Sequence, residues 1–268
     1  MLWGFNCVSL KDMKVVILAG GLGTRLAEET EVRPKPMLEI GDHPILWHIM
    51  KIYAHYGFRE FFIALGYKGA VIKRYFLDYH SLQRDMTISL ADGVTEFRNA
   101  EPEDWKVHLI DTGQDSMTGG RIKRLEEHLN DGTFMVTYGD GVCDVNIAEL
   151  LKFHAAHGKP ATVTAVRPPA RFGELIINDD QTARFSEKPQ THEGWINGGF
   201  IVFEPEIFNY LKDDESILEI DVLERLADEN RLAAYRHNGF WQCMDTLRDK
   251  RQLEKAWQDG NPPWKVWE

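Results

Sequence analysis

The sequence predicts an α/β protein built on a Rossmann-like, mostly parallel sheet flanked by helices. Two apolar runs, at residues 15–19 and 133–138, have the continuous hydrophobic pattern of strands buried on both faces. Between them, strand and helix patterns alternate, which predicts right-handed crossovers between parallel strands. Each run leads into glycine, at the strand end where open sheets bind their ligands.

The individual elements follow from periodicity and from turn residues. In the first helix, apolar residues recur at helical spacing, Pro44 suits the first turn and Gly57 suits the end. The expected helices are 44–56, from 69 to about 80, 145–157 and 246–258. The further expected strands are 60–65, 86–90, 105–111, 160–166, 174–178, 182–185 and 199–203. Because the second half departs from regular alternation, we expect an inserted β subregion and a C-terminal helical part there.

Composition narrows the class of protein. A chain of 268 residues with 43% hydrophobic and 27% charged residues is typical of a soluble globular protein. Its net charge of -11 argues against general attraction to nucleic acid, and no apolar run is long enough to span a membrane. Three cysteines without a C-x-x-C pair argue against a disulfide framework or a zinc site, so we expect a reducing, cytoplasmic location.

The chain shows no internal repeat and no low-complexity linker. We expect one domain over residues 13–268, with a core at about 13–158 and a second part at about 159–268. Residues 1–12 lack the basic start and long apolar region of a signal peptide, and Met13 directly precedes the first strand. We therefore expect residues 1–12 to be a dispensable extension.

A glycine loop after the first strand carries the strongest functional signal. Gly20, Gly21 and Gly23 leave backbone N–H groups open to an anion, with no Cβ in the way. Arg25 adds a bidentate cation, and Lys35 lies between two prolines on stiffened backbone. This stretch predicts a phosphate site.

Neither of the two commonest phosphate loops fits this stretch. A P-loop requires Gly-Lys followed by Ser or Thr, whereas the only Gly-Lys of the chain, at Lys159, is followed by Pro160. The dinucleotide fingerprint requires a glycine where this chain has Leu26, which disfavours an NAD-dependent oxidoreductase. Binding of NAD(H) without binding of a nucleoside triphosphate would revive that reading.

Two aspartates stand at the ends of apolar or aromatic stretches. Asp140 ends T-Y-G-D, and Asp245 ends F-W-Q-C-M-D. Two carboxylates together with phosphate oxygens suit a Mg²⁺ ion. Taken alone, Asp140 also suits a turn and Asp245 the N-cap of the helix that follows it. Beside a phosphate loop, the metal interpretation is favoured.

The segments L-A-G-G-L-G-T-R-L and K-P-M resemble the sugar-phosphate nucleotidyltransferase family. The segments Y-G-D-G, E-K-P and I-N-G-G-F extend the resemblance. The segment S-M-T-G-G-R and the tryptophan-rich C-terminus narrow it to the branch that uses CTP and glucose 1-phosphate. The implied fold is the nucleotidyltransferase fold, with a nucleotide-binding core at about 13–158 and a sugar-binding and C-terminal part at about 159–268. The implied reaction is Mg²⁺-dependent transfer of CMP from CTP to α-D-glucose 1-phosphate, giving CDP-glucose and pyrophosphate by in-line attack at the α-phosphate. The resemblance also implies a homo-oligomer, and a product commonly used for bacterial lipopolysaccharide O-antigen.

The resemblance assigns roles residue by residue. Arg25 and Lys35 would be catalytic, and Asp140 and Asp245 would bind Mg²⁺. The expected nucleotide-binding residues are Leu18, Ala19, Gly20, Gly21, Leu22, Gly23, Thr24, Arg25, Lys35, Ser116, Arg121 and Gly139. The expected sugar-phosphate residues are Glu187, Lys188, Asn197 and Gly198, the last two on a flexible turn.

Two alternatives remain open from the sequence. The base could be that of UTP or dTTP, since a few hydrogen bonds to a pyrimidine edge decide it. A protein of another class, a catalytically inactive nucleotide-sugar-binding regulator, is disfavoured because Arg25, Lys35, Asp140 and Asp245 are all present.

Overall fold

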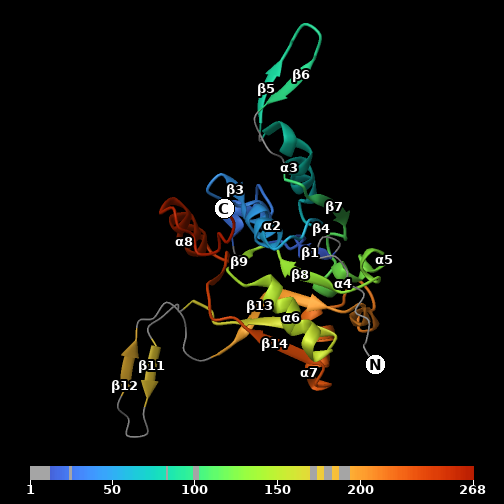
Figure 1. Ribbon diagram of the computed structural model, residues 1–268, viewed down its shortest axis with the longest axis vertical. Helices are drawn as coiled ribbons and strands as arrows, with labels where there is room; N and C mark the ends of the chain where they lie inside the picture. The colour runs from blue at the N-terminus through green and yellow to red at the C-terminus, as the bar shows by residue number, and fades with distance from the viewer. Residues whose placement is uncertain are drawn as a thin grey trace.

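The computed structural model describes residues 13–23, 26–82, 84–98, 103–169, 174–177, 183–186 and 194–268. The expected extension at residues 1–12 lies outside this part of the chain. Within it, the largest sheet has seven strands in the order β14-β10-β13-β8-β1-β4-β7 (Figure 1). Four of the six pairings in this sheet are parallel, which confirms the predicted fold class.

The regular half of the sheet consists of four parallel strands. They are β1 (Lys14–Leu18), β4 (Glu60–Leu65), β7 (Lys106–Asp111) and β8 (Phe134–Tyr138), all of which were predicted. Val15 of the central strand β1 stands opposite Phe61 of β4 and Met135 of β8. Since β8 lies beside β1, the glycine loop and Asp140 leave the sheet at adjacent positions.

The second half of the chain extends the same sheet. The strand β13 (Ile196–Phe203) pairs antiparallel with β8 and with β10 (Ala161–Val166). The edge strand β14 (Leu232–Arg236), which was not predicted, pairs parallel with β10. Its five residues are half-buried or exposed, so it lacks the continuous apolar pattern that identified β1.

The two faces of β1 serve two separate cores. Because successive side chains point to opposite faces, Val15 and Ile17 enter one core and Val16 and Leu18 enter the other. The first core is covered by α2 (Ile45–His55), α3 (Gly69–Leu82), α6 (Ile147–His157) and α8 (Leu247–Gln258), which confirm the four predicted helices. The second core is covered by α4 (Thr118–Lys123), α5 (Glu126–Leu129), η4 (Pro205–Asn209), the π-helix η5 (Leu218–Glu224) and α7 (Arg225–Asp228).

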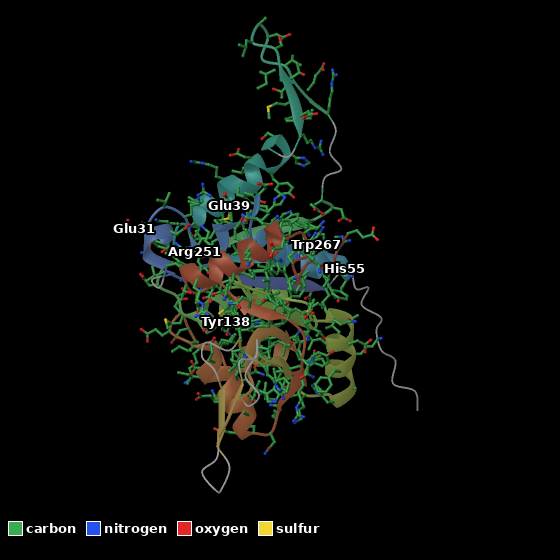
Figure 2. All side chains as sticks on the ribbon, turned by 90° about the vertical axis from the view of Figure 1, so that its left-hand side faces the viewer. Glu31, Glu39, His55, Tyr138, Arg251 and Trp267 are labelled. Atoms are coloured by element: carbon green, nitrogen blue, oxygen red, sulfur yellow. The ribbon has the colours of Figure 1, made fainter. Side chains whose placement is uncertain are left out.

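The strand expected at 86–90 is present but does not join the large sheet. It is β5 (Asp85–Ile88), which pairs antiparallel with β6 (Thr95–Arg98) in a hairpin that projects beyond α3 (Figure 1). Residues 89–94 connect the two strands, with Gly93 at φ +76° and the N–H of Val94 donating to Asp92 Oδ1 at 3.2 Å. Figure 2 shows the hairpin standing clear of the rest of the molecule, and every side chain on its strands is exposed.

Smaller elements complete the described chain. A second hairpin, of β11 (Glu174–Ile177) and β12 (Ala183–Ser186), stands apart from the sheet where an inserted β subregion was expected (Figure 1). The remaining short elements are α1 (Ala27–Thr30), η3 (Lys35–Met37), β2 (Glu39–Ile40), β3 (His43–Pro44), β9 (Gly141–Cys143) and β15 (Trp241–Cys243). The antiparallel pair β9–β15 joins the segment that follows Asp140 to the segment that precedes Asp245.

Candidate active site

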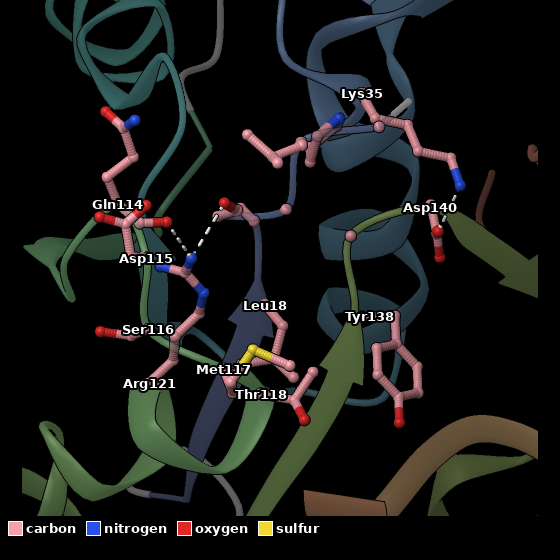
Figure 3. A pocket seen from close by; sticks show the side chains of 17 residues that line it. Leu18, Lys35, Gln114, Asp115, Ser116, Met117, Thr118, Arg121, Tyr138 and Asp140 are labelled. Atoms are coloured by element: carbon pink, nitrogen blue, oxygen red, sulfur yellow. Dashed lines mark hydrogen bonds and ion pairs between the residues drawn. The ribbon is translucent and has the colours of Figure 1, made fainter. Parts of the chain in front are cut away.

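A cavity of about 530 Å³ opens at the carboxyl ends of β1 and β8 (Figure 3). Its lining includes eleven of the residues that the sequence assigned to nucleotide, catalysis or metal: Leu18, Ala19, Gly20, Gly21, Leu22, Gly23, Lys35, Ser116, Arg121, Gly139 and Asp140. The assigned residues Thr24 and Arg25 lie outside the described residues. The structure therefore brings the predicted nucleotide site together as one cavity.

Two positions of the loop require glycine, one because of its backbone conformation and one because of a close neighbour. Gly23 has φ +64°, a conformation that side-chain-bearing residues rarely adopt. A Cβ at Gly20 would collide with the guanidinium of Arg121, whereas a Cβ at Gly21 would meet nothing within 4 Å. Gly20 thus allows a close approach by Arg121, and Gly21 leaves open space next to the cavity.

Arg121 acts mainly on the backbone around the cavity. Its buried guanidinium donates to the carbonyls of Gly20 at 3.0 Å, Leu65 at 3.1 Å and Gly113 at 2.6 Å. Burial lowers the pKa of Arg121, although a guanidinium remains charged at neutral pH. One side chain thereby fixes the glycine loop against the ends of β4 and β7.

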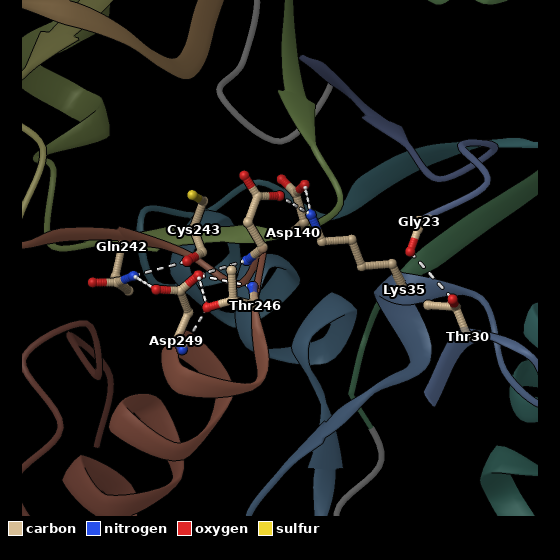
Figure 4. A network of polar contacts seen from close by, with 9 residues as sticks. Gly23, Thr30, Lys35, Asp140, Gln242, Cys243, Thr246 and Asp249 are labelled. Atoms are coloured by element: carbon tan, nitrogen blue, oxygen red, sulfur yellow. Dashed lines mark hydrogen bonds and ion pairs between the residues drawn. The ribbon is translucent and has the colours of Figure 1, made fainter. Parts of the chain in front are cut away.

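Lys35 and Asp140 line the cavity and contact each other (Figure 4), and Asp245 completes a cluster with them at its rim. The pairing of β9 with β15 brings the aspartates together, and the N–H of Met244 donates to the carbonyl of Asp140 at 2.8 Å. Lys35 Nζ donates to Asp140 Oδ2 at 2.6 Å and makes a short contact with Asp245 Oδ1. Asp140 and Asp245 therefore lie together, an arrangement that the sequence alone could not show.

The charge state of Lys35 follows from its partners. Burial acts to lower the pKa of Lys35, but the charges and hydrogen bonds of Asp140 and Asp245 outweigh it and raise the pKa above its ordinary value. Lys35 is thus a firmly protonated ammonium held between two carboxylates.

The structural alternative for Asp245 is wrong. The N-cap of α8 is Thr246, whose hydroxyl accepts from the N–H of Asp249 while Asp249 Oδ2 accepts from the N–H of Thr246. This capping box leaves the carboxylate of Asp245 directed to Lys35 instead of to the helix.

The two aspartates fit a single divalent cation. No group of three or more His, Cys, Asp or Glu side chains gathers as a metal site in the described parts of the chain. Asp140 and Asp245 nevertheless converge on one ammonium, so they present hard oxygens to one cationic centre. Mg²⁺ is commonly held by one or two carboxylates and completed by water and phosphate oxygens, which suits this donor set.

A second cavity, of about 410 Å³, lies next to Asp245. Its lining includes Ile196, Trp241 and Arg248, and the indole of Trp241 donates to the carbonyl of Gly198 at 2.8 Å. The sugar-phosphate candidate Gly198 is therefore beside this cavity, whereas Glu187 and Lys188 lie outside the described residues.

The flexible turn expected at residues 197–199 is wrong. Asn197 and Gly198 lie within β13, where the pairing register with β10 shifts between Val163 and Ala165. Gly199 has φ +79°, and the side chain of Asn197 accepts from its N–H at 2.9 Å. A local strand irregularity, rather than a loop, gives this stretch its glycine requirement.

Sequence reasoning missed the polar contacts on one wall of the first cavity. Tyr138 and Thr118 line it, and both donate to the carboxylate of Glu219. Burial, followed by the charge of Glu219, raises the pKa of Tyr138. Tyr138 could have been found from the sequence, because it directly precedes Gly139 and Asp140. Glu219 lies in a π-helix and belongs to no recognisable motif.

Comparison with known proteins places the chain among nucleotidyl transferases. Residues 14–260 match the nucleotidyl transferase family. Over 96% of its length the chain is 52% identical to the whole glucose-1-phosphate cytidylyltransferase of Salmonella typhimurium. It is 44% identical, over 95% of its length, to the whole probable glucose-1-phosphate cytidylyltransferase of Bacillus subtilis. The crystal structure of HddC from Yersinia pseudotuberculosis superposes with a TM-score of 0.66 at 24% identity, over 91% of this chain and 99% of that one, which supports the fold.

Proposed function

This chain belongs to the nucleotidyl transferase family and to its glucose-1-phosphate cytidylyltransferases, and from that membership we infer the reaction it catalyses. It transfers CMP from CTP to α-D-glucose 1-phosphate, giving CDP-glucose and pyrophosphate. The structural observation that carries the proposal is the glycine-loop cavity whose rim holds Lys35, Asp140 and Asp245 together.

The geometry suits a reaction that depends on charge and position. The attacking phosphate of glucose 1-phosphate is already anionic, so the protein does not need to supply a strong base. Backbone N–H groups of the loop at residues 20–23 offer donors to the triphosphate, and Lys35 supplies a cation at the cavity rim. Arg25 would add a second cation from the same loop.

We propose that Asp140 and Asp245 hold the Mg²⁺ ion. When bound, that ion would neutralise charge on the phosphates and polarise the α-phosphate. The β9–β15 pair and the capping box at Thr246 hold the backbone next to the two aspartates, so both carboxylates start from fixed positions.

Glucose 1-phosphate would occupy the second cavity. Asp245 and Trp241 line the second cavity, and Trp241 is hydrogen-bonded to Gly198. Asp140 lines the first cavity. The nucleotide would then lie beside Asp140 and the acceptor beside Asp245, so each substrate would border one carboxylate of the pair. Asn197, Glu187 and Lys188 remain candidates for contacts to the sugar phosphate.

We further propose a homo-oligomer in which the β5–β6 hairpin meets a second copy of the chain. Its exposed apolar side chains include Ile88 at 53%, Leu90 at 95% and Val94 at 53% exposure. Such side chains grouped on a projecting arm favour burial against another surface.

The cytoplasmic location proposed for the protein agrees with the free thiols of Cys143 and Cys243. None of the described helices is long and apolar enough to cross a membrane.

Pyrophosphate release tests the reaction directly. The full chain is supplied with glucose 1-phosphate and Mg²⁺, and release is compared among CTP, UTP, dTTP and ATP, with EDTA as the control. We expect release with CTP that EDTA abolishes. Equal release with UTP or dTTP would keep the chemistry and withdraw the base assignment, and no release with any nucleotide would favour the inactive binding protein.

A further inference from the structure

The ammonium of Lys35 stands at the point on which both metal-site carboxylates converge. It contacts Asp140 Oδ2 at 2.6 Å (Figure 4), and it also contacts Asp245 Oδ1. The Lys35 side chain is 12% exposed, and those of Asp140 and Asp245 are 30% and 22% exposed. Two negative groups thus share one internal positive group in a partly shielded place.

A divalent cation would require the same oxygens. Mg²⁺ binds carboxylate oxygens at about 2.0–2.1 Å, and two cations that close together repel each other strongly where water is partly excluded. The arrangement that stabilises Lys35 between the aspartates therefore opposes the entry of a metal ion. Before a metal binds both carboxylates, the ammonium has to leave at least one of them.

The position of Lys35 would also allow its ammonium to reach an alternative partner. The residue lies between Pro34 and Pro36, so its backbone is constrained while its long side chain can rotate. Lys35 also lines the first cavity, and its Cβ lies 3.3 Å from where a Cβ of Gly23 would be. Triphosphate oxygens bound at the glycine loop would be an alternative partner for the same ammonium.

We propose that Lys35 is an internal counter-ion that competes with the divalent cation, and that nucleotide phosphates release it. Metal and nucleotide then bind with positive coupling, and Lys35 carries that coupling. This inference rests on the proposed function, because it takes the glycine loop as the phosphate site and the aspartate pair as the metal site.

Binding of Mn²⁺ to the full-length protein, measured from the spin-resonance signal of free Mn²⁺, tests the proposal without turnover. Lys35→Met removes the charge and keeps an unbranched side chain one atom shorter, and Lys35→Gln is a second neutral variant. We expect both to bind Mn²⁺ on the order of tenfold more tightly than wild type in the absence of nucleotide. After subtraction of the Mn²⁺ that CTP binds in a protein-free sample, addition of CTP should tighten Mn²⁺ binding strongly in wild type and much less in the variants.

Two controls separate competition at the site from a change in net charge. Lys51→Met removes a lysine whose Nζ lies 3.0 Å from Glu103 Oε1, in a pair that lines neither cavity, and it should leave Mn²⁺ affinity unchanged. In Lys35→Met combined with Asp140→Asn, the gain should disappear.

Three results would overturn the proposal. They are unchanged or weaker Mn²⁺ binding in both neutral variants, an equal gain in Lys51→Met, and a gain that persists without the Asp140 carboxylate. Failure of the proposed reaction would be seen separately, as wild-type protein that releases no pyrophosphate from CTP and glucose 1-phosphate.

Discussion

The two halves of the chain reach the same site by different routes. In the first half, the glycine loop and Asp140 follow the neighbouring strands β1 and β8, and the N–H of Gly139 donates to the carbonyl of Leu18 at 3.0 Å. In the second half, Asp245 arrives through the short pair β9–β15. Local motifs therefore define the proposed nucleotide side of the site, whereas a long-range strand pairing brings in the second aspartate.

Loss of Lys35 should have the largest effect, because this residue links the two halves. In Lys35→Ala, kcat with CTP and glucose 1-phosphate should fall by about 100- to 1000-fold, the usual cost of removing one group that stabilises transition-state charge. Steady-state kinetics at saturating Mg²⁺ measure it. Near-wild-type kcat would remove Lys35 from the reaction, even if the variant binds Mn²⁺ more tightly.

Much of the first half could be predicted because its signals are local. The apolar pattern of β1, the glycines after it and the Pro-Lys-Pro stretch each encode their own geometry. Convergence of Asp245 on Asp140 depends on a pairing between distant segments, and the resemblance supplied it. Glu219 and the carbonyl contacts of Arg121 had no sequence signal, since π-helices and backbone acceptors leave no characteristic residue pattern.

The close approach within the first half can be tested at Gly20. A Cβ there would meet the guanidinium of Arg121, so Gly20→Ala should lower the free energy of unfolding by about 1–3 kcal/mol, as overpacking does. Gly21→Ala is the matched control, because its Cβ would meet nothing within 4 Å. Urea unfolding without nucleotide compares them, and equal stabilities would contradict the tight contact.

Glu219 tests whether the second half shapes the nucleotide cavity. Glu219→Ala removes the acceptor of Tyr138 and Thr118, and the loss of a charged hydrogen-bond partner costs about 1.5–3 kcal/mol. We expect the KM for CTP to rise about tenfold, with a smaller change in kcat. Glu224→Ala, at an exposed position of the same π-helix, is the control. A purely structural role would lower stability and leave the KM unchanged.

The smallest effect should appear where the C-terminal segment meets the first half. The indole of Trp264 donates to His48 Nδ1 at 3.3 Å, and burial lowers the pKa of His48 to about 4. Because the folded-state pKa lies below the unfolded value of 6.5, the stability that neutral His48 contributes is present above pH 6.5 and is lost as the pH falls toward 4.

Between pH 7.5 and 5.5 we expect this histidine to account for a loss of about 1 kcal/mol. Urea unfolding at both values measures the loss, and His48→Gln should show a correspondingly smaller difference. An equal difference in the variant would assign the pH dependence to other groups.

The most direct test of the two-sided centre is Mn²⁺ binding in the presence of CTP. Wild type, Asp140→Asn, Asp245→Asn and the double variant should be titrated side by side, and the Mn²⁺ that CTP binds in a protein-free sample should be subtracted. If both halves hold one ion, each single variant loses most of the tight binding and the double variant loses little more. Full affinity in either single variant, or losses that add independently, would contradict a shared site built from both halves.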